Sequence, residues 1–147
     1  MQRSHFMGLE TIIVEKREGT AILTLNRPDK LNAVNMTMRR EILATLAELE
    51  ADVETKVLIV TGSGRGFCSG ADINELDAGT QDAALQKTVN HSLLVMAKSF
   101  YDFQKPVLGA INGAAAGDGA QWVLAFDLNV ASEKAKFGWP ATSLGIL

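Results

Sequence analysis

Short apolar runs alternate along the chain with stretches in which apolar residues recur at helical spacing. The runs consist of strand-forming residues and predict strands at 12–14, 21–25, 57–60, 107–111 and 128–131. A turn at Glu18-Gly19 joins the first two runs and predicts a strand pair. The run at 57–60 has no polar alternation, which is typical of a strand covered on both faces in a parallel sheet.

A turn at 26–29, where proline fixes φ, precedes the first amphipathic helix. Either Asn35 or Thr37 can cap this helix. Its apolar stripe consists of Met38, Ile42, Leu46, Leu49 and Val53. The charged residues that fall mainly off the stripe, and that need no role beyond solubility, are Arg39, Arg40, Glu41 and Glu48.

A longer helix is predicted at 82–103, where Lys105-Pro106 stops it, and a short one at 120–126. The stripe of the longer helix consists of Leu85, Val89, Leu93, Met96, Phe100 and Phe103. Strands that alternate with helices indicate an α/β fold with mainly parallel pairing.

Glycine-rich segments follow two of the predicted buried strands, at 62–72 and at 112–119. Because the order of strand, glycine-rich turn and helix occurs twice, both turns are expected to open at the same end of the layers. Ligands bind at that end in open α/β folds. The first segment matches neither a dinucleotide fingerprint, nor a Walker loop, nor a Gly-x-Ser-x-Gly elbow, so a plain turn is an equal interpretation of it alone.

Composition narrows the functional classes. The 147 residues are 47% hydrophobic and 21% charged, as in an ordinary soluble α/β domain. A net charge of −3 without a basic stripe argues against a nucleic-acid partner. Polar residues and glycines interrupt the apolar region 107–126, so no membrane span is expected. Cys68 is the only cysteine and fits a reducing, cytoplasmic compartment.

Four passages, in order and spacing, resemble the crotonase (enoyl-CoA hydratase/isomerase) superfamily. They are LNRPDKLNA at 25–33, VTG at 60–62 with FCSGAD at 67–72, KPVLGAING at 105–113, and ASEKAKFG at 131–138 with Pro140. The resemblance covers about 9–147 and implies the ClpP/crotonase fold, a spiral of ββα units. Residues 1–8 are expected to be a leader or disordered segment. The chain ends at Leu147, where the family continues into C-terminal helices, so an incomplete domain is expected.

The resemblance implies an enzyme that processes acyl-CoA thioesters and stabilises a thioester enolate. Two backbone N–H groups form the oxyanion hole in this family, and the matching positions here are Ala71 and Asp118. Each preorganised donor can lower the barrier by about 3 kcal/mol. Neither a metal nor a tightly bound cofactor is implied, since coenzyme A arrives as part of the substrate.

Asp118 departs from the family pattern, which has glycine at this position. Its carboxylate would repel a developing anion unless it points away, caps the following helix, or is itself the acid/base group. A helix cap is the interpretation we expect.

The acid/base groups depart further. Hydratases of the family use two glutamates, and the matching positions here hold Gln121 and Ala141. Neither side chain exchanges a proton near neutral pH, so ordinary hydration should be lost, although Gln121 could orient a water. The alternative is a catalytically inactive acyl-CoA-binding or assembly subunit.

The resemblance also implies a coenzyme A site and an assembly. Lys30 and Arg65 would meet phosphates, and Trp139 would either stack on an acyl group or pack in a core or interface. Family members form trimers or pairs of trimers, so a homotrimer or hexamer is expected. The positions matched to the coenzyme A and acyl path are Lys30, Leu31, Ala33, Arg65, Ser69, Ala71, Asp72, Ile73, Gly117, Asp118 and Pro140.

Other polar residues are expected to have structural roles. His91 should face solvent, Asp72 should hold its loop through backbone bonds, and Cys68 should be a small apolar filler. Because no Ser-His-Asp set is present, a protease of the related Clp type is disfavoured.

Overall fold

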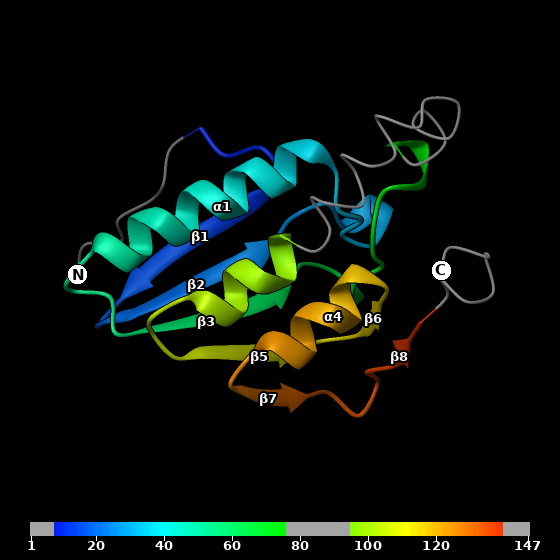
Figure 1. Cartoon of the computed structure of the whole chain (residues 1–147). Coiled ribbons are helices and arrows are strands. Elements are labelled where there is room, and N and C mark those ends of the chain that lie inside the picture. The colour runs from blue at the N-terminus through cyan, green and yellow to red at the C-terminus, as the bar shows by residue number, and fades with distance from the viewer. Residues whose placement is uncertain (1–7, 76–94, 140–147) are drawn as a thin grey trace.

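Two β-sheets and a layer of helices make up the computed structural model, which describes residues 8–75 and 95–139. One sheet has the strand order β1-β2-β3-β5-β7 and the other β4-β6-β8 (Figure 1). The strands are β1 (Ile12–Arg17), β2 (Thr20–Leu25), β3 (Val57–Gly62), β4 (Gly66–Cys68), β5 (Val107–Ile111), β6 (Ala114–Ala116), β7 (Leu128–Ala131) and β8 (Phe137–Gly138). The helical segments are η1 (Pro28–Lys30), α1 (Met36–Ala51), residues 73–75, residues 95–102 and α4 (Asp118–Ala125).

The predicted strand pair at the N-terminal side is confirmed as an antiparallel hairpin, β1–β2, with Arg17 opposite Thr20. Its two-residue turn has φ of 49° at Glu18 and 80° at Gly19. Positive φ at both positions matches the right-handed twist of the flanking strands, and glycine adopts it without strain.

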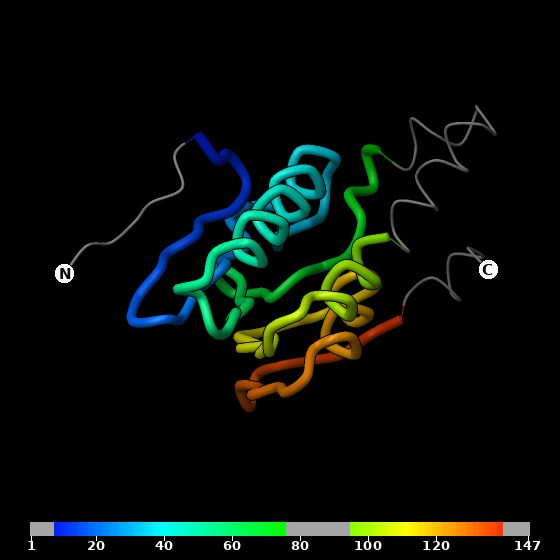
Figure 2. The backbone as a smooth tube through the Cα atoms, turned by 60° about the vertical axis from the view of Figure 1, so that its left-hand side comes forward, coloured from blue at the N-terminus to red at the C-terminus, as the bar shows by residue number. Residues whose placement is uncertain are grey.

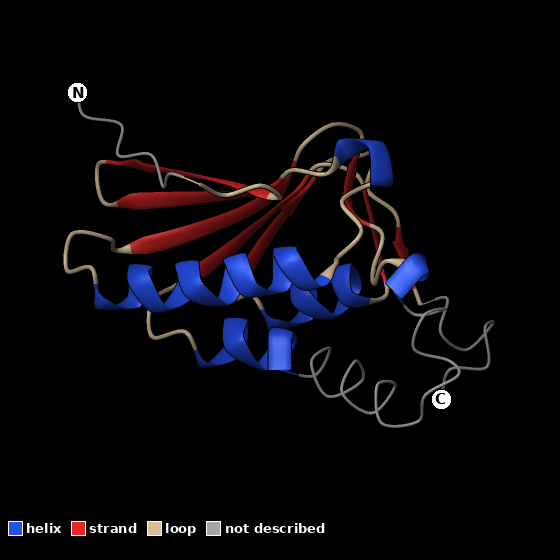
Figure 3. Ribbon diagram, turned by 90° about the horizontal axis from the view of Figure 1, so that it is seen from above, coloured by secondary structure: helices blue, strands red, loops and turns tan. Residues whose placement is uncertain are grey.

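The remaining pairs of the larger sheet are parallel, as predicted: β2 with β3, β3 with β5, and β5 with β7. The hairpin and β7 lie at opposite edges of this sheet (Figures 1 and 2). Figure 3 shows α1, residues 95–102 and α4 along the same face of the strands. Leu58 and Val60 are therefore buried, whereas Val57 and Ile59 stay partly exposed on the other face. The prediction that β3 is covered on both faces is wrong for the described residues.

Helix α1 begins at a side-chain cap, because the Asn35 side chain accepts a hydrogen bond from the Met38 N–H at 2.9 Å. The predicted stripe is confirmed for the residues inside the helix, Met38, Ile42, Leu46 and Leu49. Val53 is the exception, since it lies beyond the end of α1 and is 75% exposed.

Two charged residues of α1 contradict the prediction of a purely solvated face. Arg39 is 3% exposed. The Glu41 carboxylate accepts hydrogen bonds from the backbone N–H groups of Glu10 and Thr11 and from the Thr11 hydroxyl. Burial raises the pKa of Glu41, but these donors outweigh it and lower the pKa overall. Arg39 and Glu41 differ from the prediction because they have polar partners elsewhere in the fold. The spacing of apolar residues along a helix does not reveal such partners.

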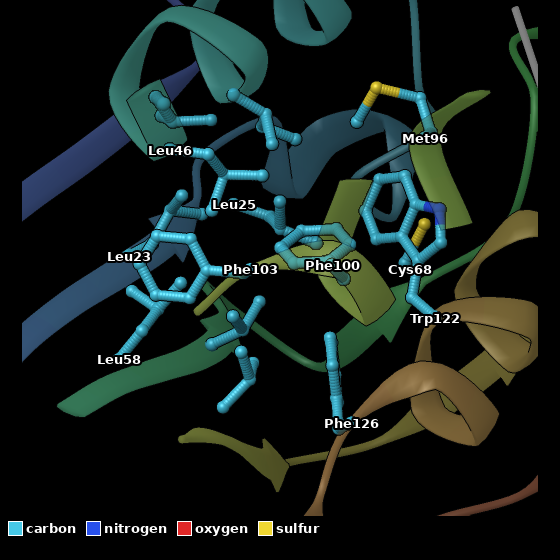
Figure 4. Packing of buried hydrophobic residues seen from close by; sticks show 14 of the residues in the cluster. Leu23, Leu25, Leu46, Leu58, Cys68, Met96, Phe100, Phe103, Trp122 and Phe126 are labelled. Carbon is cyan, nitrogen blue, oxygen red and sulfur yellow. The ribbon is translucent and has the colours of Figure 1, made fainter. Parts of the chain in front are cut away.

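Aromatic side chains fill the space between the helices and the sheet (Figure 4). The Phe100 ring lies 5.4 Å from Trp122 and 5.2 Å from Phe126, measured between centroids. The end of the predicted helix at 82–103 is confirmed at 95–102, with Met96, Phe100 and Phe103 buried. Its start, including Leu85, Val89 and Leu93, lies outside the described residues. None of the helices in 8–75 and 95–139 has the length and apolar character to cross a membrane.

The three-stranded sheet was not predicted. Its strands are two or three residues long and consist mostly of glycine and alanine, so they carry no alternation. One of them, β6, lies inside the segment 112–119 that was predicted to be only a turn. Helix α4 also begins at Asp118, two positions before its predicted start.

Candidate functional site

The short sheet brings together segments that are far apart in the sequence. Strand β4 pairs with β6 and β6 pairs with β8, all in parallel. The Gly117 N–H donates to the Gly138 carbonyl at 3.1 Å, and Val34 forms an isolated bridge with Ala71. The Ser69 N–H donates to the Leu31 carbonyl at 3.0 Å, and Gly113 lies against Gly66, so parts of all four family-like passages lie beside this sheet.

The first turn presents the Ala71 amide. The Val34 N–H donates to the Gly70 carbonyl at 2.8 Å, and the Val34 carbonyl accepts from the Asp72 N–H at 3.0 Å. In a parallel bridge, the residue between the two bonded positions directs its own N–H to the opposite side. The Ala71 N–H is therefore aimed away from Val34.

The second turn presents the Asp118 amide. Gly117 is the N-cap residue of α4, with φ of 52°, and Asp118 is the first residue of the helix. The first N–H groups of a helix have no acceptor within it, so the Asp118 N–H remains available to another group.

Cys68 lies against both turns, because the backbones of Gly70 and Gly119 both act to lower the pKa of its thiol. A Cβ added at Gly70 would lie 3.5 Å from the Asp118 nitrogen, and one at Gly119 would lie 2.5 Å from the Cys68 carbonyl oxygen. The prediction that Cys68 fills buried space is confirmed. Burial is the main cause that raises the pKa of its thiol to about 12.

The Asp118 carboxylate turns towards α1, where its Oδ2 lies 3.7 Å from Nη2 of Arg39. Oδ2 is buried and accepts no hydrogen bond from the residues that the structure describes. Burial raises the pKa of Asp118 to about 6, although Arg39 acts in the opposite direction. The expected helix cap is wrong, because Asp118 occupies the first helical position, and Gly117 at the N-cap offers no side chain.

Asn32 supports the first turn and was missed by the sequence analysis. It is fully buried, and its amide donates to the carbonyls of Ser63, Gly66 and Phe67 at 3.0 to 3.1 Å. Its Oδ1 accepts the Arg27 N–H at 2.8 Å. The only signal for this role was the position of Asn32 inside the family-like passage at 25–33.

Asp72 has the structural role that was expected, with an added partner. Its Oδ1 accepts the Asn74 N–H at 3.2 Å, and its Oδ2 lies 2.9 Å from Nη1 of Arg27. Burial raises the pKa of Asp72, but Arg27 and Asn74 outweigh it and lower the pKa overall.

The remaining candidate residues are spread around these turns. Ser69 bonds Leu31 through its N–H at 3.0 Å and Lys30 through its hydroxyl at 3.3 Å, which brings these three together. Lys30 and Arg65 are exposed. Ala33 is buried and Ile73 is 65% exposed.

Gln121 is partly buried, and its Oε1 is a buried atom without a hydrogen bond in the described structure. Trp139 is 41% exposed. Pro140, Ala141 and His91 lie outside the described residues. Within the described ranges, no group of His, Cys, Asp and Glu side chains is arranged to hold a metal ion.

Comparisons with known proteins agree with this arrangement. The chain is 38% identical over 141 residues to a probable enoyl-CoA hydratase of Rhodobacter capsulatus, covering 96% of this chain and 53% of the relative. It is 35% identical over 141 residues to the 1,2-epoxyphenylacetyl-CoA isomerase of Escherichia coli, covering 95% of this chain and 54% of that protein.

Solved structures are also similar. An enoyl-CoA hydratase/carnithine racemase of Magnetospirillum magneticum matches with a TM-score of 0.89 and 28% identity, over 97% of this chain and 53% of that one. Pseudomonas aeruginosa AtuE matches with a TM-score of 0.89 and 32% identity, over 94% of this chain and 54% of that one.

The chain thus spans about half the length of the relatives it matches. The predicted crotonase fold is confirmed by these structural matches. A family model described as enoyl-CoA hydratase/isomerase matches residues 15–147. The chain belongs to the enoyl-CoA hydratase/isomerase family.

Proposed function

We propose that this chain supplies the oxyanion-binding half of an acyl-CoA thioester site, with the N–H groups of Ala71 and Asp118 as donors. Proton loss next to a thioester, or addition to its conjugated double bond, places negative charge on the carbonyl oxygen. Preorganised N–H donors stabilise that charge more than they stabilise the neutral substrate. The carrying observation is that the two turns pack against each other, since a Cβ added at Gly70 would lie 3.5 Å from the Asp118 nitrogen.

The relatives support a thioester substrate and leave the reaction open. One is named a hydratase and another an isomerase of a CoA ester. We infer that this chain also acts on an acyl-CoA and that the side chains around the two donors decide the reaction. We further propose that the complete protein is cytoplasmic and that it forms a homotrimer or a pair of trimers. Light scattering of the purified protein tests the oligomeric state.

The second candidate is an acyl-CoA-binding subunit without catalysis, and Gln121 favours it. By the resemblance, Gln121 and Ala141 stand where hydratases have glutamates, so no carboxyl group at these positions moves a proton. The Oε1 of Gln121 is buried and unbonded in the described structure, which suits an amide oxygen that accepts a hydrogen bond from a water or from a substrate hydroxyl.

Two measurements on the complete natural polypeptide separate these functions. A coupled assay measures hydration of crotonyl-CoA, and calorimetry measures binding of CoA. Turnover supports the enzyme, although turnover at ordinary hydratase rates would contradict the proposed effect of Gln121 and Ala141. Binding without turnover of crotonyl-CoA or of isomerisable enoyl-CoA esters supports the subunit. Absence of both binding and turnover would refute the thioester site itself.

A further inference from the structure

The buried pair of Arg39 and Asp118 has no part in the function proposed so far. Asp118 is 6% exposed and Arg39 is 3% exposed. Charged residues are almost never this buried unless they are paired. Burial of two charges costs more than an ordinary salt bridge returns, so such a pair is weak evidence for stability. A role other than stability therefore has to be considered.

The position of Asp118 suggests that role. The backbone N–H of Asp118 is a proposed donor to the thioester oxygen. The Asp118 carboxylate belongs to the same residue and is therefore a negative charge close to that donor. A free carboxylate there would oppose the developing anion, and low polarity around it would strengthen the repulsion. Within residues 8–75 and 95–139, Asp118 Oδ2 accepts no hydrogen bond, so no described donor disperses the charge on this oxygen.

Arg39 is placed to cancel this charge. Its Nη2 lies 3.7 Å from Asp118 Oδ2, and its Nη1 contacts the Met36 sulfur at 3.6 Å, within the first turn of α1. The adjacent Arg40 is exposed and reaches the Thr37 hydroxyl instead. The guanidinium of Arg39 thus lies in the interior beside the turn at Gly117-Asp118. Of the two proposed donor residues, Ala71 and Asp118, only Asp118 has a carboxylate.

We propose that Arg39 is a positioning residue of the thioester site, which neutralises the Asp118 carboxylate and so lets the Asp118 N–H stabilise an oxyanion. This role rests on the proposed function. In this role Arg39 and Asp118 act together. Loss of Arg39 should weaken oxyanion binding only while the Asp118 carboxylate is present and charged.

Protonation of Asp118 gives the role a signature in pH. The charged and titratable groups that face this carboxyl in the described structure are Arg39 from α1 and Cys68 from β4. Burial raises the pKa of Cys68 to about 12, so the thiol stays neutral over the working range. Without Arg39 the carboxyl should hold its proton to higher pH, and the damage should therefore lessen as pH falls.

The test compares two ligands on the complete natural polypeptide. Acetoacetyl-CoA forms an enolate whose charge reaches the thioester oxygen, whereas CoA has no such oxygen. Calorimetry gives the ratio of their affinities for wild type, Arg39→Met, Arg39→Lys and the double variant Arg39→Met/Asp118→Asn. Arg40→Met is the matched control, because it removes the same charge from the neighbouring, exposed position.

We expect Arg39→Met to lower the preference for acetoacetyl-CoA at pH 8 by roughly tenfold to a hundredfold, which is less than the roughly 10²–10³-fold effect of removing an oxyanion-hole donor outright. The loss should shrink towards pH 5.5. Arg39→Lys should keep most of the preference, the double variant should regain it to within about threefold, and Arg40→Met should match wild type. A purely structural role would weaken both ligands together and would give no rescue.

A second measurement needs no ligand. The Asp118 carboxyl carbon, followed by NMR, should titrate at higher pH in Arg39→Met or, if that variant does not fold, in Arg39→Gln. An unchanged titration, or an unchanged ligand preference in variants that still bind CoA, would overturn the role of Arg39 alone. A wild type that binds neither ligand would refute the proposed function, and this role with it.

Discussion

The turn at Gly70-Ala71 and the turn at Gly117-Asp118 lie side by side, but different chemistry holds each of them. The first is fixed by neutral amide hydrogen bonds from Asn32 and by a partly exposed ion pair, Arg27 with Asp72. The second is fixed by the start of α4 and carries a buried ion pair, Arg39 with Asp118.

The two carboxylates consequently shift in opposite directions. Hydrogen bonds and a near cation lower the pKa of Asp72, whereas burial outweighs Arg39 and raises the pKa of Asp118. One turn is therefore expected to be steadiest when its acid is charged and the other when its acid is neutral. The contributions of Asp72 and Asp118 to the stability of their turns can therefore be distinguished by pH and by mutation.

The largest effect is expected at Asn32. Asn32→Ala removes one amide that bonds Ser63, Gly66, Phe67 and Arg27 in the interior. At about 1 kcal/mol for each bond, the free energy of unfolding should fall by roughly 3–4 kcal/mol. Urea denaturation measures the loss.

Asn74→Ala is the matched control for Asn32, because Asn74 is exposed and bonds only the nearby Asp72 among the described residues. Its cost should stay below about 1 kcal/mol. Similar losses for the two variants would show that the first turn does not depend on Asn32.

Asp118 should give the next effect, in the pH dependence of stability. Its pKa is raised from 3.8 to about 6, so the folded protein holds the proton more tightly than the unfolded chain. Stability should therefore fall as pH rises from about 4 to about 6, by about 3 kcal/mol at 1.4 kcal/mol for each pKa unit. Asp118→Asn should lack this fall, which urea denaturation at a series of pH values measures. Parallel curves for the two proteins would contradict the assignment.

Asp72 should show the opposite sign and a smaller effect. Its pKa is lowered, so its contribution is present above the unfolded pKa near 3.8 and is lost as pH falls through the folded pKa. Side chains of the pair are 19% and 10% exposed, so about 1 kcal/mol is expected. A double-mutant cycle of Arg27→Gln and Asp72→Asn measures it. A coupling energy that grows with added salt would argue against an ionic contact.

The smallest effect is expected at the exposed cations beside the first turn. If Lys30 and Arg65 meet coenzyme A phosphates, Lys30→Gln or Arg65→Gln should weaken CoA binding a few-fold, in line with about 1 kcal/mol for an exposed ionic contact. Calorimetry should also show a weaker dependence on salt. Lys134→Gln is a control at another exposed lysine. Unchanged affinity in the first two variants would return both residues to the solvated surface.

Periodic segments were predictable from the sequence. The hairpin, α1, β5 and β7 follow from local patterns of apolar residues, and the alternation of strands and helices gave the parallel sheet. The three-stranded sheet was not predictable in this way, because its short strands of glycine and alanine are defined by their neighbours in space.

The site shows the same limit. The two turns were found from glycines after buried strands, and the resemblance pointed to Ala71 and Asp118. The partners of these turns were missed, because Asn32 and Arg39 look like ordinary polar residues until contacts between remote segments are known. Arg39 in particular lies three positions before the buried Ile42 and seven before Leu46, so it borders the buried face, and contacts outside the helix decide whether it is solvated or enclosed.

The Cys68 sulfur lies where the backbones of both turns meet, and the chain has one cysteine in all. With its thiol pKa raised to about 12, this sulfur is inert as long as the turns stay closed. Its alkylation by a maleimide would then require a transient opening, as amide exchange does in a protected core. The natural cysteine is therefore a built-in kinetic reporter, whose labelling rate would reveal how often the two turns separate.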